Sequence, residues 1–145
     1  MSVTFRSNLP AVTAAFERAG KAAMTAGIEN MRGMTVKNLK QAGTGRTYRV
    51  PGTQRTYTAS APGEFPAVRL ADLSGPTGVE TEVTTDGTGV TATIGSRFKH
   101  GLILEKKAVS KGGRPWLKRT LDENRDAVYA GFEKGWAAAL KKEGM

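Results

Sequence analysis

The 145-residue sequence contains no cysteine and only one histidine, His100. The lack of cysteine excludes disulfides, zinc–thiolate sites and thiol catalysis. A histidine metal site needs partner ligands, so we interpret His100 as an ordinary surface residue. No serine lies in a G-x-S-x-G nucleophile elbow, and acidic residues are few, at 13. We therefore expect a protein that is not an enzyme and that uses no cofactor or metal.

Long apolar runs are also missing. No run approaches the roughly 20 residues that cross a bilayer, and the first residues lack the charged-then-apolar layout of a signal peptide. We expect no contact with a membrane, and folding in the cytoplasm or in a particle assembled there. The content of 39% hydrophobic and 24% charged residues is typical of one globular domain, here residues 1–145.

Positive charge is abundant, with a formal net charge of +9. Such a balance indicates an acidic partner or nucleic acid. The charge is spread along the chain, because residues 1–72 carry ten Lys and Arg against four acids, and residues 73–145 carry twelve against nine. The densest patch, residues 97–119, has eight basic residues and one acid, Glu105. A solvated loop, an acidic protein surface and packaged DNA all remain open as explanations of this patch.

Apolar residues at helical spacing predict a long N-terminal helix over residues 10–41, with Asn8 as its cap. Gly20, Gly27 and Gly33 would each weaken this helix by about 1 kcal/mol relative to alanine, which leaves a kink open. The predicted packing stripe comprises Val12, Phe16, Ala19, Ala23, Ala26, Met31, Met34 and Leu39.

The middle of the chain predicts short strands. Residues 47–50 and 56–58 flank a Pro51-Gly52 turn signal. Residues 79–85 and 90–94 alternate apolar and polar side chains around an Asp-Gly-Thr-Gly loop, which predicts an antiparallel hairpin with one apolar face. The apolar run 102–104 fits either a further strand or a buried turn of helix.

A basic loop at residues 106–113 precedes Arg114-Pro115 and a C-terminal helix. The apolar residues of that helix are Leu117, Leu121, Val128, Phe132, Trp136 and Leu140. We predict an α+β fold: a long N-terminal helix, a small antiparallel sheet with a central β-hairpin, a C-terminal helix packed on the sheet, and an extended proline-containing arm.

Two segments are fixed by proline. The first is Ala-Ser-Ala-Pro-Gly-Glu-Phe-Pro-Ala at residues 59–67, and the second is Gly-Arg-Pro-Trp-Leu at residues 113–117. Each proline pushes the residue before it towards an extended conformation. We expect residues 43–66 to form a flexible arm, with an exposed, irregular part at residues 61–66. An ordinary surface loop remains the alternative.

The order of these elements resembles the tail-completion (neck) proteins of long-tailed phages, a family that includes the lambda-type minor tail protein Z. That family has a long N-terminal helix, an Ala-Ser-Ala-Pro-Gly-Glu-x-Pro-Ala-like arm, a β-hairpin, a glycine-bearing loop, an Arg-Pro-aromatic-Leu junction and a closing helix. The resemblance covers nearly the whole chain. It is imperfect at residues 70–73, which keep only the leucine of the usual Thr-Gly-x-Leu. At residues 104–107 only the glutamate of Glu-Phe-Gly-Thr remains.

The resemblance implies a structural virion protein, located in the neck and, during assembly, in the host cytoplasm. Such proteins form a ring, commonly six-fold, between the tail terminator and the head-side connector. The implied partners are copies of the chain itself, the tail terminator and tail-tube proteins, and a head-side connector or stopper. Genomic DNA in the channel is a further partner left open. A tail terminator and a head-side adaptor remain alternative roles.

The interface residues that we predict come from the two proline-fixed segments and the basic loop. They are Pro62, Gly63, Glu64, Phe65, Pro66, Lys106, Lys107, Lys111, Arg114 and Trp116. A third hypothesis belongs to another class, a basic nucleic-acid-binding domain whose tyrosines stack on bases. Its candidate residues are Arg46, Tyr48, Arg49, Arg55 and Tyr57.

Overall fold

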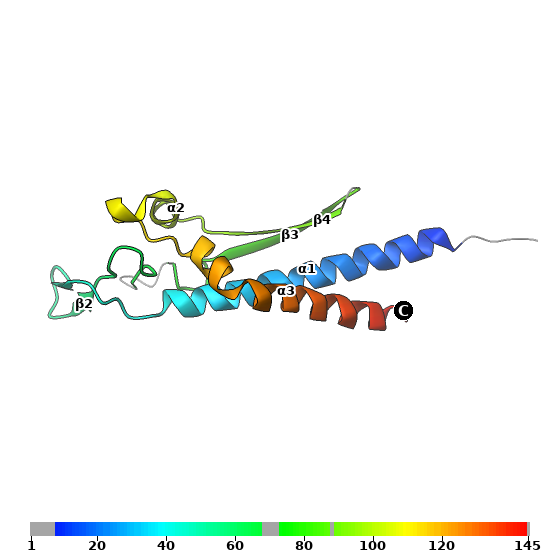
Figure 1. Cartoon of the computed structure of the whole chain (residues 1–145), viewed down its shortest axis with the longest axis horizontal. Helices are drawn as coiled ribbons and strands as arrows, with labels where there is room; N and C mark the ends of the chain where they lie inside the picture. Colours follow the sequence, from blue (N-terminus) through cyan, green and yellow to red (C-terminus); the bar gives the residue numbers. More distant parts are fainter. Residues whose placement is uncertain (1–7, 68–72, 88, 145) are drawn as a thin grey trace, which may run out of the picture.

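A long helix, α1 (Leu9–Leu39), runs along much of the length of the molecule (Figure 1). The computed structural model describes residues 8–67, 73–87 and 89–144. Asn8 occupies the N-cap position, but the predicted cap is wrong, because its side chain makes no capping hydrogen bond to the described residues. The helix continues through Gly20, Gly27 and Gly33, so these glycines do not break it.

The predicted α+β class is confirmed, although the strands within the described residues form two separate two-stranded antiparallel sheets rather than one. The first sheet pairs β1 (Thr47–Arg49) with β2 (Thr56–Thr58), and the second pairs β3 (Glu80–Asp86) with β4 (Gly89–Gly95). The remaining elements are α2 (Lys99–Lys106), the 3₁₀ turn η1 (Val109–Lys111) and α3 (Leu117–Lys142).

The β3–β4 hairpin has the predicted apolar face. Val90, Ala92 and Ile94 are half-buried, while Thr91 and Thr93 between them are exposed. Alternation of this kind places the apolar row of an antiparallel pair on the core and the polar row in water. The pairing extends to Asp86 opposite Gly89, so these two residues belong to the strands and not to the predicted loop.

Helices α1 and α3 pack antiparallel, and glycines set how closely they approach. A Cβ added at Gly27 would overlap the ring of Phe132. A Cβ at Gly135 would lie 2.9 Å from the Cβ of Ala26. Arg18 Nη2, in the N-terminal half of α1, donates to Oε2 of Glu143, the C-cap residue of α3, at 2.5 Å, which fits the same orientation. Gly20 and Gly27, which sequence reasoning treated as weak points in a helix, are therefore contact positions between the two helices.

Two apolar clusters hold the elements together. Ile28 and Met31 of α1 and Val128 of α3 are buried together, and the hairpin residues Val83 and Ala92 pack against them. This cluster joins the C-terminal helix to α1 and to the hairpin. A second cluster lies near the C-terminal end of α1 and comprises Leu39, Phe65, Leu73, Val79 and Trp116.

A kink occurs in α3 rather than in α1. Asn124 has a non-helical backbone, with φ −127° and ψ 22°, and its side-chain Nδ2 donates to the Thr120 carbonyl at 2.9 Å. The turns before Asn124 run at an angle to the rest of the helix (Figure 1). A side chain that inserts into the helical hydrogen-bond ladder is a known cause of such bends.

Gly27→Ala and Gly33→Ala should change stability in opposite directions. The Gly27 variant must displace Phe132, which we expect to lower the free energy of unfolding by about 1–3 kcal/mol. A Cβ at Gly33 meets none of the described residues within 4 Å, so Gly33→Ala should gain up to about 1 kcal/mol of helix propensity. Urea denaturation followed by circular dichroism measures both. Equal stabilisation by the two variants would contradict the packing role of Gly27.

Candidate functional site

The two proline-fixed segments lie against each other. The Gly63 amide donates to the Gly113 carbonyl at 3.3 Å. Arg114 Nη2 donates to the Ser60 carbonyl at 2.6 Å, and Arg119 Nη1 donates to the Gly63 carbonyl at 2.6 Å. We call residues 59–67 together with 113–117 the joint. The segments that stood out in the sequence therefore bind each other within one subunit.

The joint is partly built into the core. Phe65 is 7% exposed and Trp116 is 2% exposed, and Pro66 is also buried. The Trp116 Nε1 donates to the Gly101 carbonyl at 2.9 Å, and the Arg119 guanidinium lies 4.6 Å from the Phe65 ring centroid. The predicted exposure of residues 61–66 is thus wrong at Phe65 and Pro66, because removing these apolar side chains from water stabilises the fold.

Glu64, which we predicted as an interface residue, makes its hydrogen bonds within its own subunit. Its carboxylate accepts hydrogen bonds from the Ala61 amide at 2.7 Å, the Thr44 amide at 3.1 Å and the Thr44 hydroxyl. These donors, the Thr44 hydroxyl most of all, hold the pKa of Glu64 below its ordinary value of 4.5. Gly63 has φ +84°, a left-handed conformation that favours glycine, while Pro62 stays exposed.

Glu105 of α2 caps α3, a role that sequence reasoning missed. Its Oε2 accepts from the amides of Trp116 at 2.7 Å and Leu117 at 2.9 Å, and its Oε1 accepts from the Lys118 amide at 2.9 Å. The first amides of a helix have no partner within the helix, and the positive end of the helix dipole favours a carboxylate. The one available signal was that Glu105 is the single acid in the basic stretch 97–119.

The predicted basic loop is partly helical. Lys106 is the last residue of α2, and Lys111 ends η1. Lys106, Lys107 and Lys111 are all exposed and remain available to a partner. Arg114, which we predicted as an interface residue, is half-buried and donates to two backbone carbonyls, Ser60 and Gly112, so its guanidinium stabilises the joint.

The apolar run 102–104 is helical, but its predicted burial is wrong for two of its three residues. Leu102 is 52% exposed and Ile103 is 61% exposed, whereas Leu104 packs against the second core cluster. His100, in the same helix, is exposed and stacks on Phe98 with ring centroids 5.5 Å apart. This part of α2 therefore presents two large apolar side chains to solvent.

The β1–β2 hairpin carries the candidate nucleic-acid residues. Tyr48 and Tyr57 face each other across the strands and stack with centroids 5.6 Å apart. The Arg46 guanidinium lies 5.6 Å from the Tyr48 centroid, and Arg49 bonds to the Thr53 carbonyl at 3.0 Å. Each tyrosine ring therefore covers part of the face that the other could offer to a base. Tyr48 nevertheless remains 44% exposed.

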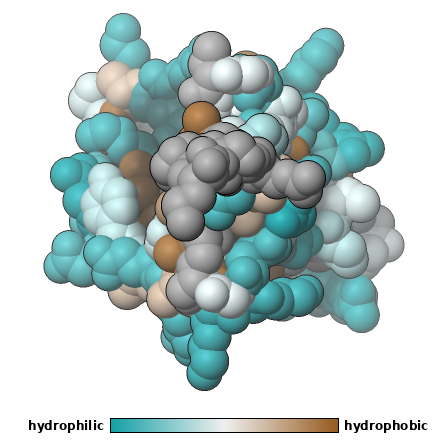
Figure 2. Space-filling model, turned by 90° about the vertical axis from the view of Figure 1, so that its right-hand side faces the viewer, coloured by the Kyte–Doolittle hydropathy of each residue, from teal (hydrophilic) through white to brown (hydrophobic). Residues whose placement is uncertain are grey.

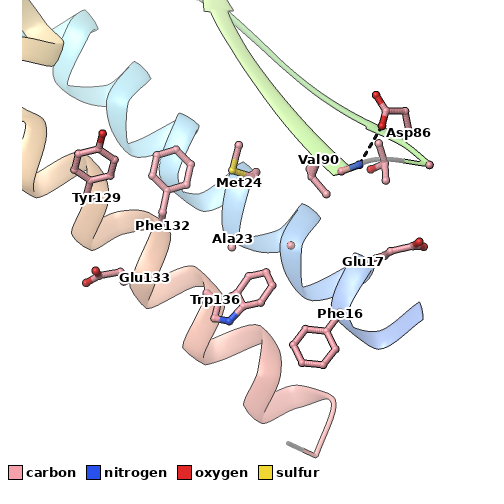
Figure 3. Close-up of a pocket in the computed structure, with 14 residues that line it drawn as sticks. Phe16, Glu17, Ala23, Met24, Asp86, Val90, Tyr129, Phe132, Glu133 and Trp136 are labelled. Carbon is pink, nitrogen blue, oxygen red and sulfur yellow. Dashed lines mark hydrogen bonds between the residues drawn. The ribbon is translucent and has the colours of Figure 1, made fainter. Parts of the chain in front are cut away.

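Sequence reasoning also missed an apolar groove between the tip of the β3–β4 hairpin and the α1–α3 pair (Figure 3). Its volume is about 870 Å³. Phe16 and Trp136 are 45% and 36% exposed in it, with ring centroids 6.1 Å apart. The lining residues are Phe16, Glu17, Gly20, Ala23, Met24, Thr85, Asp86, Gly87, Gly89, Val90, Tyr129, Phe132, Glu133 and Trp136.

The groove differs in charge from the rest of the molecule. Among the described residues, its lining includes three carboxylates and no Lys or Arg, although the chain has a net charge of +9. Glu17 and Glu133 are exposed on α1 and α3, and Asp86 accepts a hydrogen bond from the Gly89 amide at 3.0 Å. Seen from this end, hydrophobic residues lie in recesses between hydrophilic ones (Figure 2).

Comparison with protein-family models, with curated proteins and with solved structures found no match. The resemblance to phage neck proteins therefore stays a prediction. Within residues 8–67, 73–87 and 89–144, no group of three or more His, Asp or Glu side chains could hold a metal ion. None of the helices in that part of the chain is long and apolar enough to cross a membrane.

Glu105→Ala should loosen the start of α3. It removes the acceptor for three backbone amides, and we expect a loss of about 1–2 kcal/mol in the free energy of unfolding. Glu105→Gln keeps one acceptor oxygen and should lose less. Chemical denaturation gives both values, and hydrogen exchange should show faster exchange at Leu117 and Lys118. Unchanged exchange at these amides would contradict the capping role.

Proposed function

We propose that this chain is a structural virion protein of a long-tailed phage, a tail-completion subunit that joins the tail to the head connector. It acts by assembly into a ring and not by catalysis. The observation that carries the proposal is the open apolar groove, which holds exposed Phe16 and Trp136 at one end of an elongated molecule. The order of sequence motifs supplies the link to the phage neck.

Apolar surface of this kind favours a protein partner. A contiguous exposed apolar patch rimmed by polar residues is typical of an interaction site. Contact between two different patches on successive copies gives a heterologous interface, which forms a ring when the rotation closes. A tail terminator or a head-side adaptor would use the same geometry, so both remain alternative positions for the ring within the neck.

The structure changes which residues we assign to contacts. Phe65, Pro66 and Trp116 hold the subunit together, so deletion of residues 61–66 would damage the fold rather than test assembly. The exposed Lys106, Lys107 and Lys111 remain our candidates for contacts to neighbouring copies or to adjoining rings.

Removal of the gene from the phage that encodes this protein should leave separate heads and tails, visible by electron microscopy. Phe16→Glu places a charge in the groove, and we expect it to restore joined particles at least about tenfold less well than the wild type. Thr91→Glu, on the outer face of β4, is the matched control and should restore them fully. Normal particles without the protein would refute the proposed function.

A second candidate function, DNA binding, is favoured by one observation. Exposed Tyr48 lies beside Arg46, with Arg49 and Arg55 exposed on the same hairpin. Exposed arginines on one hairpin fit the phosphates of a duplex, and an exposed aromatic ring can stack on a base where the strands separate. Such contact would suit a neck channel through which DNA passes.

Duplex DNA should then bind with micromolar affinity at low salt. The affinity should fall with a log–log slope of about −0.9 per phosphate contacted, and Arg46→Ala should reduce that slope by about one contact. Fluorescence anisotropy over a salt series measures both, with Arg125→Ala on α3 as the control. No binding at low salt would remove this candidate and leave the assembly role intact.

A further inference from the structure

Helix α2 has an outer face that combines apolar and basic side chains. Leu102 and Ile103 are more than half exposed, while Gly101 on the other side is buried. Lys99 and Lys106 each lie three or four residues from Leu102 and from Ile103. The four side chains therefore share one face of the helix. An i, i+3, i+4, i+7 pattern is how an amphipathic helix fits into a groove. The outer face of α2 here means Lys99, Leu102, Ile103 and Lys106.

The groove complements the outer face of α2, because it combines apolar side chains with carboxylates. Its apolar wall is made by Phe16, Val90 and Trp136, and its carboxylates include exposed Glu17 and Glu133. Copies of a protein with net charge +9 repel one another, so a self-contact needs carboxylates opposite cations. The α2 helix of eight residues is about 12 Å long, which places a lysine near each end of the apolar pair.

We propose that the outer face of α2 of one copy docks into the groove of the next copy. Leu102 and Ile103 would lie on the aromatic wall, and Lys99 and Lys106 would face Glu17 and Glu133. The inference rests on the proposed function, because it names the contact that builds the ring. The partner is a second copy of this chain, and charge complementarity is the reason for choosing it.

The positions of the two surfaces make this contact heterologous. The hairpin tip and the groove lie towards one end of the long axis, and α2 lies towards the other (Figure 1). A subunit therefore cannot fill its groove with its own α2. Every copy offers one outer face and one groove, which is what a closed ring of repeated contacts requires.

Disulfide trapping tests the contact directly, because the chain has no cysteine of its own. Ile103→Cys carrying one tag is mixed with Val90→Cys carrying another, under mild oxidation. We expect a disulfide-linked heterodimer on non-reducing gels. Thr91→Cys is the matched control, since residue 91 is the next residue of β4 but points away from the groove. Its yield with Ile103→Cys should be at least about tenfold lower.

Charge reversal provides a second, independent readout. Lys99→Glu with Lys106→Glu reverses the outer face, and Glu17→Lys with Glu133→Lys reverses the groove. Each double variant alone should self-associate at least about tenfold more weakly in analytical ultracentrifugation. A mixture of the two restores opposite charges at every contact, so association should return. The differences should shrink at high salt.

Equal trapping at residues 90 and 91, or no heterodimer at all, would overturn the inference. Failure of the mixed charge variants to associate better than either alone would do the same. None of these results depends on the head–tail joining assay. A wrong contact is therefore distinguishable from a wrong function. Normal virion assembly without the protein would instead remove the proposed function, whatever the trapping shows.

Discussion

The close approach of α1 and α3 is the constraint on which the rest of the structure depends. Gly27 leaves space for the ring of Phe132, and a Cβ at Gly20 would lie 3.3 Å from the ring of Trp136. Because these glycines have no side chains, the two aromatic rings lie on the helix pair beside the hairpin tip instead of being pushed apart. The same contact therefore fixes the helix pair and supplies the apolar wall of the groove.

The joint fixes the other end of the molecule. Arg114 and Arg119 bind backbone carbonyls of residues 59–67, and Phe65 and Trp116 fill the core beneath them. Hydrogen bonds from a guanidinium to carbonyls satisfy backbone groups that an irregular segment cannot pair with itself. An irregular segment thus becomes a rigid support for α2, which presents Leu102 and Ile103 to solvent.

The periodicity of the sequence was sufficient to predict the helices and strands, but it did not predict the contacts between them. The alternation at residues 90–94 and the helical spacing before Leu39 predicted a strand and a helix correctly, because those patterns are local. The burial of Phe65 and the capping by Glu105 depend on partners far along the chain, which no local pattern encodes. The groove was missed for the same reason, since α1, α3 and the hairpin meet there only in the folded chain.

The capping of α3 by Glu105 also has a consequence for how the chain folds. The first turn of α3 contains no acidic residue of its own, and its amides depend on a carboxylate eleven positions upstream of Trp116. The beginning of the C-terminal helix is therefore stabilised only after α2 has come into place. Folding of this region should be cooperative, with α2 and the first turns of α3 ordering together as one unit.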